Sequence, residues 1–290
     1  VSQAVGQSVT VRRGEVETVA HIREKGIGVT GYLGQRRGHA STADFSADAV
    51  HAAVGKALAI ARFTAEDPAA GLADPDRLAR VIPDLDLFDP WELTVEQAIA
   101  LGCDAEAAAL AVDRRLTNTE GATVAWSESE FVYANTHGFL GGYRSTRHHI
   151  DCSVIGDPGD GGAMQRDYWY TAGRGATDLQ PAAEVGRIAG ERTVRRLGAR
   201  KLGTVECPVL FEAPEAADLV GAFVGAVSGG ALYRKSSFLL DSLGQPVFSA
   251  NVSIREDPHI PRARGSAPFD NEGVATAPRD VVTDGVVRGY

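Results

Sequence analysis

The chain of 290 residues is 44% hydrophobic and 23% charged, with a formal net charge of −9 at pH 7. Its length is sufficient for about two domains, and its composition excludes disorder over most of the sequence. Nucleic-acid binding is disfavoured, because an acidic surface repels phosphate.

Cysteine usage and hydropathy indicate a cytoplasmic protein without a membrane segment. Cys103, Cys152 and Cys207 are odd in number and widely spaced. This pattern is typical of a reducing compartment rather than of a disulfide framework. The most apolar run, residues 216–232, contains Asp218 and four glycines, and it is too short to span a bilayer.

Residues 1–66 are predicted to form an N-terminal domain made of a β-meander and a helix. Apolar and polar residues alternate from Val9 onward, and turn signals occur at Arg13-Gly14, Lys25-Gly26 and 34–38. Ser46 is a suitable N-cap for the helix that follows.

Two further segments follow this domain. Proline and aspartate recur in residues 67–91, which predicts an interdomain linker. Residues 92–202 are predicted to form a central α+β domain. It opens with a capping box at Thr94 and Gln97, continues with strands joined by a hairpin loop at 135–138, and closes with a helix that ends near Gly198.

Residues 203–290 are predicted to begin a β-rich C-terminal domain. A strand is expected at 205–211, a helix from about Pro214, and a hairpin at Asp284-Gly285. The strand after that hairpin lacks the rest of a sheet, so we expect this domain to be incomplete. Because the strands follow one another through short turns, the predicted fold class is α+β, with mainly antiparallel sheets and few flanking helices.

Two motifs suggest ligands but have simpler explanations. Residues 26–31 match the dinucleotide fingerprint, but no helix N-terminus follows to receive a pyrophosphate, which favours glycines in twisted strands. His149 and Asp151 would share one face of a strand. Two ligands are fewer than zinc requires, so this pair is only a weak alternative to a chain without a metal site.

Gly221, Gly225 and Gly229 would lie on one face of the helix that begins near Pro214. Each glycine costs about 1 kcal/mol relative to alanine in a helix interior. We therefore expect close backbone packing at this face, inside the domain or against another subunit. The segment that follows is expected to form an interface or a substrate-facing surface. Its candidate residues are Tyr233, Arg234, Lys235, Ser236 and Ser237.

Six stretches, in order along the whole chain, resemble the PmbA/TldE branch of the TldD/PmbA family. They are residues 37–42, 117–121, 142–148, 165–170, 233–244 and 268–274. The last two are the most specific. Family members continue past the position of Tyr290 with a β-rich part, which agrees with an incomplete C-terminal domain.

The resemblance implies a zinc metalloprotease whose metal belongs to another subunit. TldD-type members carry a His-Glu-x-x-x-His helix, and the corresponding hexad here is 221–226. Gly221 and Ala226 stand in place of the histidines, and Ala222 in place of the glutamate. None of these side chains can bind a metal or move a proton. The resemblance thus implies a subunit without a cofactor of its own.

The implied partners are a TldD-like zinc subunit and peptide or unfolded polypeptide substrates, with a homodimer as an alternative state of the isolated chain. Two other hypotheses stay open. One is a stand-alone metallopeptidase with ligands beyond the residues shown or near His149, and the other is a regulatory binding protein. Co-purification with a zinc-containing partner would favour the heteromeric complex, and a stoichiometric metal in the isolated chain would favour the stand-alone enzyme.

Overall fold

The computed structural model describes residues 1–159 and 161–290. The chain divides into two compact units. Unit 1 contains residues 1–199 and 259–276, and unit 2 contains residues 200–258 and 277–290.

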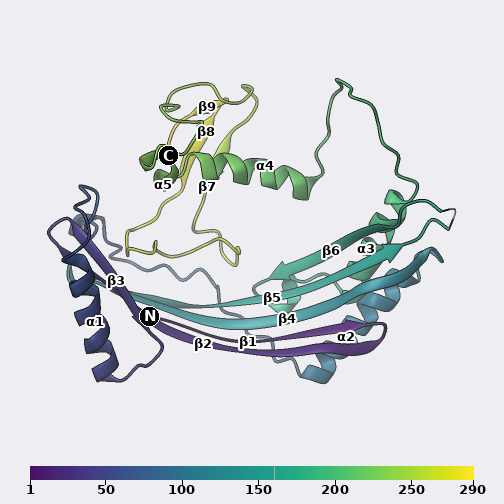
Figure 1. Cartoon of the computed structure of the whole chain (residues 1–290), viewed down its shortest axis with the longest axis horizontal. Coiled ribbons are helices and arrows are strands. Elements are labelled where there is room, and N and C mark those ends of the chain that lie inside the picture. Colours follow the sequence, from purple (N-terminus) through teal and green to yellow (C-terminus); the bar gives the residue numbers. More distant parts are fainter. Residues whose placement is uncertain (160) are drawn as a thin grey trace. The chain divides into compact units, whose positions relative to one another are not determined.

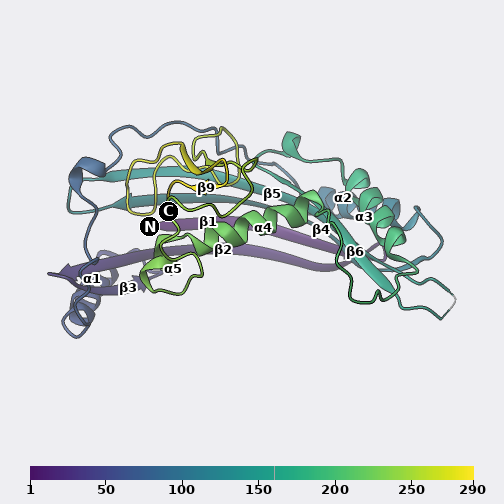
Figure 2. The ribbon, with the colours of Figure 1, turned by 90° about the horizontal axis from the view of Figure 1, so that it is seen from above.

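Unit 1 is built on one six-stranded antiparallel sheet with the strand order β3-β2-β1-β4-β5-β6. The strands are β1 (Ser2–Arg12), β2 (Glu15–Leu33), β3 (Arg36–Thr42), β4 (Leu116–Ala134), β5 (Leu140–Gly156) and β6 (Gln165–Gly173). Figure 1 shows the curvature of this sheet, and Figure 2 shows β1, β2, β4 and β5 side by side along its length. Segments 1–66 and 92–202 therefore both contribute strands to the same sheet.

The pairing of β1 with β2 overturns one sequence-based expectation. The predicted turn at Lys25-Gly26 is wrong, because both residues lie inside β2 and pair with Gln3 and Ser2 of β1. The whole run 26–31 is part of the same strand. This confirms that its glycines belong to a strand and not to a phosphate-binding turn.

Three helices, α1 (Ala47–Ala61), α2 (Val95–Leu110) and α3 (Ala182–Arg196), cover one face of the sheet. The N-cap at Ser46 and the capping box at Thr94 are confirmed. Val9, Val11 and Val124 are completely buried in the core that α2 and α3 form with the strands. Two short 3-10 helices, η1 (Pro75–Arg77) and η2 (Ala176–Asp178), lie in the connections.

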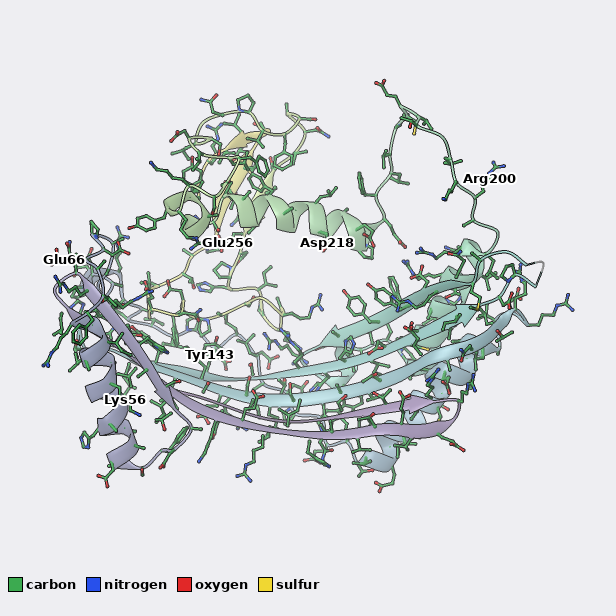
Figure 3. The ribbon with its side chains drawn as sticks, in the orientation of Figure 1. Lys56, Glu66, Tyr143, Arg200, Asp218 and Glu256 are labelled. Carbon is green, nitrogen blue, oxygen red and sulfur yellow. The ribbon has the colours of Figure 1, made fainter. Side chains whose placement is uncertain are left out.

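The opposite, concave face of the sheet carries polar side chains along its middle. Thr10 and Thr123, for example, share a hydrogen bond of 3.1 Å between their hydroxyl oxygens. At one end Phe269 packs edge-on against Tyr143 at 5.6 Å between ring centroids, and it also contacts Phe131. Tyr143 is labelled in Figure 3. Through Phe269, the segment 259–276 therefore covers this end of the concave face.

The proline- and aspartate-rich segment 67–91 belongs to unit 1 and packs within it. Its Leu78, Leu85 and Leu87 are buried. The carbonyl oxygen of Leu87 accepts a hydrogen bond of 2.9 Å from the backbone of Thr146 on β5. This segment therefore runs along the edge of β5. The predicted boundaries of the domains on either side of it stay predictions.

Unit 2 combines two helices with a small antiparallel sheet. Its elements are α4 (Ala213–Ala226), α5 (Gly229–Tyr233), β7 (Ile254–Glu256), β8 (Arg279–Thr283) and β9 (Val286–Val287). Asp284 and Gly285 both have positive φ, 49° and 78°, as a type I′ turn requires, which confirms the predicted hairpin. No helix among the described residues is long and apolar enough to cross a membrane.

The predicted strand at 205–211 is wrong, because these residues form no regular element. Leu210 is 98% exposed. A strand needs a neighbour to satisfy its backbone groups, and among the described residues no strand pairs with this segment. The predicted α+β class with antiparallel sheets and few helices is nevertheless confirmed.

Candidate functional site

Helix α4 carries the positions at which the family resemblance places a metal-binding motif. Pro214 lies in its first turn, where its missing N–H costs no hydrogen bond. Phe223 is the buried residue of the helix and packs edge-on against Phe248 at 5.0 Å between ring centroids. Gly221 and Ala222 are exposed. The helix is therefore anchored to unit 2 through one narrow face.

The side chains at these positions do not fit a zinc site. Gly221, Ala222 and Ala226 have no nitrogen, oxygen or sulfur in their side chains, whereas zinc in proteins is bound by histidine, cysteine and carboxylate groups. The acidic residue nearest along the helix is Asp218, labelled in Figure 3. In residues 1–159 and 161–290, no three or more such ligands are grouped where they could hold a metal ion.

The glycines at 221, 225 and 229 correct a further expectation, because α4 ends at Ala226 and Gly229 is instead the first residue of α5. A Cβ atom added at Gly221, Gly225 or Gly229 would have no neighbour within 4 Å. The expectation that these glycines pack closely against another part of the chain is therefore wrong. Packing against another molecule stays a prediction.

The candidate segment that follows begins at the end of α5. Tyr233 is the last residue of the helix, Arg234 is its C-cap, and Lys235 has a left-handed backbone with φ 54°. The backbone N–H of Ser236 then donates to Ala231 at 2.9 Å. The hydroxyl of Ser237 accepts a hydrogen bond of 3.0 Å from the backbone of Leu239. These contacts fix a tight turn after α5.

The turn presents two cations beside exposed aromatic rings. Arg234 and Lys235 are exposed, and among the described residues no carboxylate lies within ion-pair distance of either. Tyr233 is 61% exposed and Phe238 is 85% exposed. Aromatic side chains and arginine are the residue types enriched at protein interfaces. The arrangement suits binding of an acidic group or a carboxylate next to apolar side chains.

His149 and Asp151 are brought together on β5 of unit 1. Their Nε2 and Oδ1 atoms lie 3.0 Å apart, and both side chains are about one-third exposed. The ring of His149 also lies 5.7 Å from that of Tyr170. The two atoms form a hydrogen-bonded pair, and no third ligand in the described chain joins it. This pair belongs to a different unit from the turn after α5.

Sequence reasoning missed a slot in unit 1 between the segment 82–88 and the edge of β5. The slot has a volume of about 440 Å³ and is also lined by Gly142, Tyr143, Arg144 and Pro268. The guanidinium of Arg144 stacks on the ring of Phe88 at 3.6 Å. No periodic pattern in the sequence signals this site, because it depends on where a linker without regular structure lies.

Comparison with known proteins places all parts of the chain in one family. Residues 1–61 match the model of PmbA/TldA metallopeptidase domain 1, residues 88–197 the central domain, and residues 204–290 the C-terminal domain. The chain is 46% identical over its full length to Metalloprotease PmbA of Escherichia coli O157:H7. It is 42% identical to the Metalloprotease PmbA homolog of Haemophilus influenzae. In both cases it spans 64% of the relative's length.

Solved structures show the same fold. A Bacteroides thetaiotaomicron protein, described as a candidate modulator of DNA gyrase, is 27% identical with a TM-score of 0.92, and this chain covers 66% of it. TldE from Thermococcus kodakarensis is 18% identical with a TM-score of 0.75, and 64% of it is covered. Both matches include the whole of this chain. The chain therefore belongs to the PmbA/TldD metallopeptidase family, as a PmbA/TldE-type member.

Proposed function

We propose that this chain is the non-catalytic subunit of a heteromeric zinc metalloprotease that degrades or processes peptides and unfolded polypeptides in the cytoplasm. The observation that carries the proposal is the chemistry of α4, where Gly221, Ala222 and Ala226 provide no metal ligand and no proton-transfer group. A TldD-like partner would then supply the zinc. This chain would supply an interface and part of the surface that holds the substrate.

The exposed face of α4 and the turn after α5 support a role in assembly. Gly221 and Gly225 leave the backbone of the helix accessible, and Val220 and Val224 beside them are 42% and 49% exposed. Contiguous exposed apolar surface is typical of protein–protein contacts. The cations of the adjacent turn would pair with acidic groups of the partner or with substrate carboxylates.

The decisive experiment is reconstitution of the isolated chain with a TldD-like subunit from the same genome. We expect the isolated chain to contain no stoichiometric zinc and to cleave no peptide, the partner to contain zinc, and cleavage to require both. Zinc bound stoichiometrically by this chain alone would support a stand-alone metallopeptidase instead. His149→Ala would then test whether the pair on β5 holds that metal. Failure to assemble with the zinc subunit would favour a regulatory binding protein.

A further inference from the structure

Strand β5 has an unpaired backbone edge beside the slot in unit 1. Strand β6 pairs with β5 only from His148 onward, so residues 140–147 have a strand neighbour on one side only. That neighbour is β4, with Gly142 opposite Val132 and Arg144 opposite Glu130. On the side away from β4, residues 140–147 therefore have no strand neighbour in the described part of the chain, although Thr146 is bonded there to Leu87 and Arg174.

The direction of the backbone groups follows from Thr146. Its N–H donates to Leu87 at 2.9 Å, so it points away from β4. In an antiparallel strand, the N–H and C=O of one residue point to the same side, and that side alternates from each residue to the next. The pairing of β5 with β4 is regular over 140–147, so Gly142 and Arg144 point to the same side as Thr146. The N–H and C=O of Gly142 and Arg144 must therefore point into the slot. In the described part of the chain, no backbone or side-chain group bonds to them from that side.

The charges around the slot leave one carboxylate without a cation. Arg144 is held by the ring of Phe88 and by Glu128, whose oxygen lies 3.4 Å away. Asp86 is paired with Arg262 at 2.9 Å. The exposed carboxylate of Asp84 accepts a hydrogen bond from the backbone of Asp86 at 3.0 Å. Among the described residues it has no cationic partner.

We propose that this slot binds a short extended peptide segment, which pairs through its backbone with Gly142 and Arg144 and places a lysine or arginine side chain against Asp84. Backbone pairing to an exposed sheet edge gives affinity, and pockets for alternate side chains give specificity. The apolar wall formed by Ile82, Tyr143 and Pro268 would receive a neighbouring apolar side chain. The volume of about 440 Å³ fits a few residues rather than a folded domain.

This inference rests on the proposed function in one respect, namely that the chain handles peptides. It adds a binding site on this chain itself, in unit 1. The site can be tested without a zinc subunit. If the slot fails to bind peptide while the reconstituted complex cleaves, only this inference falls. If the complex lacks activity while the slot binds peptide, only the proposed function falls.

The probe is a fluorescent, capped peptide, acetyl-Thr-Val-Lys-Val-Thr-amide, titrated with the isolated full chain and followed by anisotropy. Two N-methylated versions are compared with it, one methylated at the lysine and one at both valines. Only alternate N–H groups of a paired strand face its neighbour. We therefore expect one methylated peptide to lose binding and the other to keep it.

Two variants at one position separate backbone pairing from side-chain contact. Arg144→Pro removes the outward N–H, and proline is tolerated on an edge strand when its nitrogen faces away from the sheet. We expect it to weaken binding by about tenfold or more, whereas Arg144→Ala should change binding by less than about threefold. Asp84→Asn should weaken binding of the lysine peptide but not of a matched leucine peptide. Circular dichroism checks that each variant is folded.

Three results would overturn the proposal. One is no saturable binding of the probe by the wild-type chain up to about 1 mM. Another is equal loss or equal retention of binding by the two N-methylated peptides, a readout that does not depend on any protein variant. The third is self-association in sedimentation that Arg144→Pro abolishes, because the edge would then be occupied by a second copy of this chain.

Discussion

The guanidinium of Arg262 lies 2.7 Å from the carboxylate of Asp89, although 173 positions separate the two residues in the sequence. The same guanidinium also contacts Asp86 at 2.9 Å and Asp178 at 3.0 Å. The hydrogen bond to Asp89 makes the largest contribution to raising the pKa of Arg262 above its usual value, and the bonds to Asp86 and Asp178 raise it further. One cation therefore joins three segments of unit 1 that are distant in the sequence.

Replacing Arg262 by alanine should destabilise unit 1. The substitution would leave three neighbouring carboxylates without their cation, and Arg262 is only 30% exposed. We expect a loss of about 1–2 kcal/mol in the free energy of unfolding, moderated by solvent screening of the aspartates. Urea unfolding measures it. Arg80→Ala is the matched control, because its pair with Asp76 is 82% and 97% exposed. Equal stability of the two variants would contradict a structural role for Arg262.

Asp178 should make the stability of unit 1 depend on pH in the acid range. The backbone N–H of Gly175 donates to its carboxylate and, with the bond from Arg262, lowers its pKa below the ordinary value of 3.8. A carboxyl with a lower pKa in the folded state binds protons more readily when unfolded. Its contribution is thus complete well above pH 3.8 and is lost as the pH falls through the folded pKa. Asp178→Asn should be less stable than wild type at pH 7, and this gap should close towards pH 3 in urea unfolding. A gap that stays constant would argue against this linkage.

Local features of the fold could be predicted from the sequence, and long-range pairings could not. The capping box at Thr94 and the turn at Asp284-Gly285 depend on neighbouring residues, so residue type determines them. The pairing of Ser2 with Phe131 across β1 and β4 depends on tertiary packing, for which no short-range signal exists. The α4 positions were found through the family resemblance. The slot beside Arg144 was missed because a linker without periodicity forms one of its walls.

The glycines of the two units should respond to substitution in opposite directions. At Gly186 on α3, a Cβ atom would lie 1.8 Å from the carbonyl oxygen of Ala105 on α2. Gly186→Ala should therefore cost about 1–3 kcal/mol through overpacking. Gly225→Ala meets open space and should stabilise α4 by about 0.5–1 kcal/mol, through helix propensity and a less flexible unfolded chain. Denaturant unfolding tests both substitutions.

Gly225→Leu separates packing inside the chain from packing against a partner. The sequence predicted close backbone packing at Gly225, which a leucine would overfill, but the open surroundings of Gly225 predict a normal melting temperature for the isolated chain. If α4 packs against the zinc subunit, the same variant should assemble poorly. Normal assembly would rule out a close contact at this position.

The three thiols should react in the order of their exposure. Cys207 is exposed, Cys103 is half-buried and Cys152 is buried. Burial raises the pKa of Cys152 to about 12 and also raises the pKa of Cys103. The thiolate is the reactive form, so iodoacetamide at pH 8 should modify Cys207 first and Cys152 last in the folded chain. Peptide mass spectrometry follows the reaction. Modification of native Cys152 as fast as Cys207 would show that the core around β5 opens readily.

Arg234→Ala should leave the isolated chain as stable as wild type while weakening its assembly. The side chain is exposed and has no carboxylate partner in the described residues, so its removal breaks no ion pair within the chain. At an interface, loss of one arginine that pairs with an acidic group typically costs about 1–2 kcal/mol or more. We expect a dissociation constant raised about tenfold for the zinc subunit, measured by titration calorimetry, with a thermal melt as the check on folding. Arg200→Ala is the matched control, because Arg200 is also exposed in unit 2 but lies outside the turn after α5. Equal affinities of the two variants would remove Arg234 from the proposed interface. A large effect of both would indicate that general charge attraction, and not this turn, drives the association.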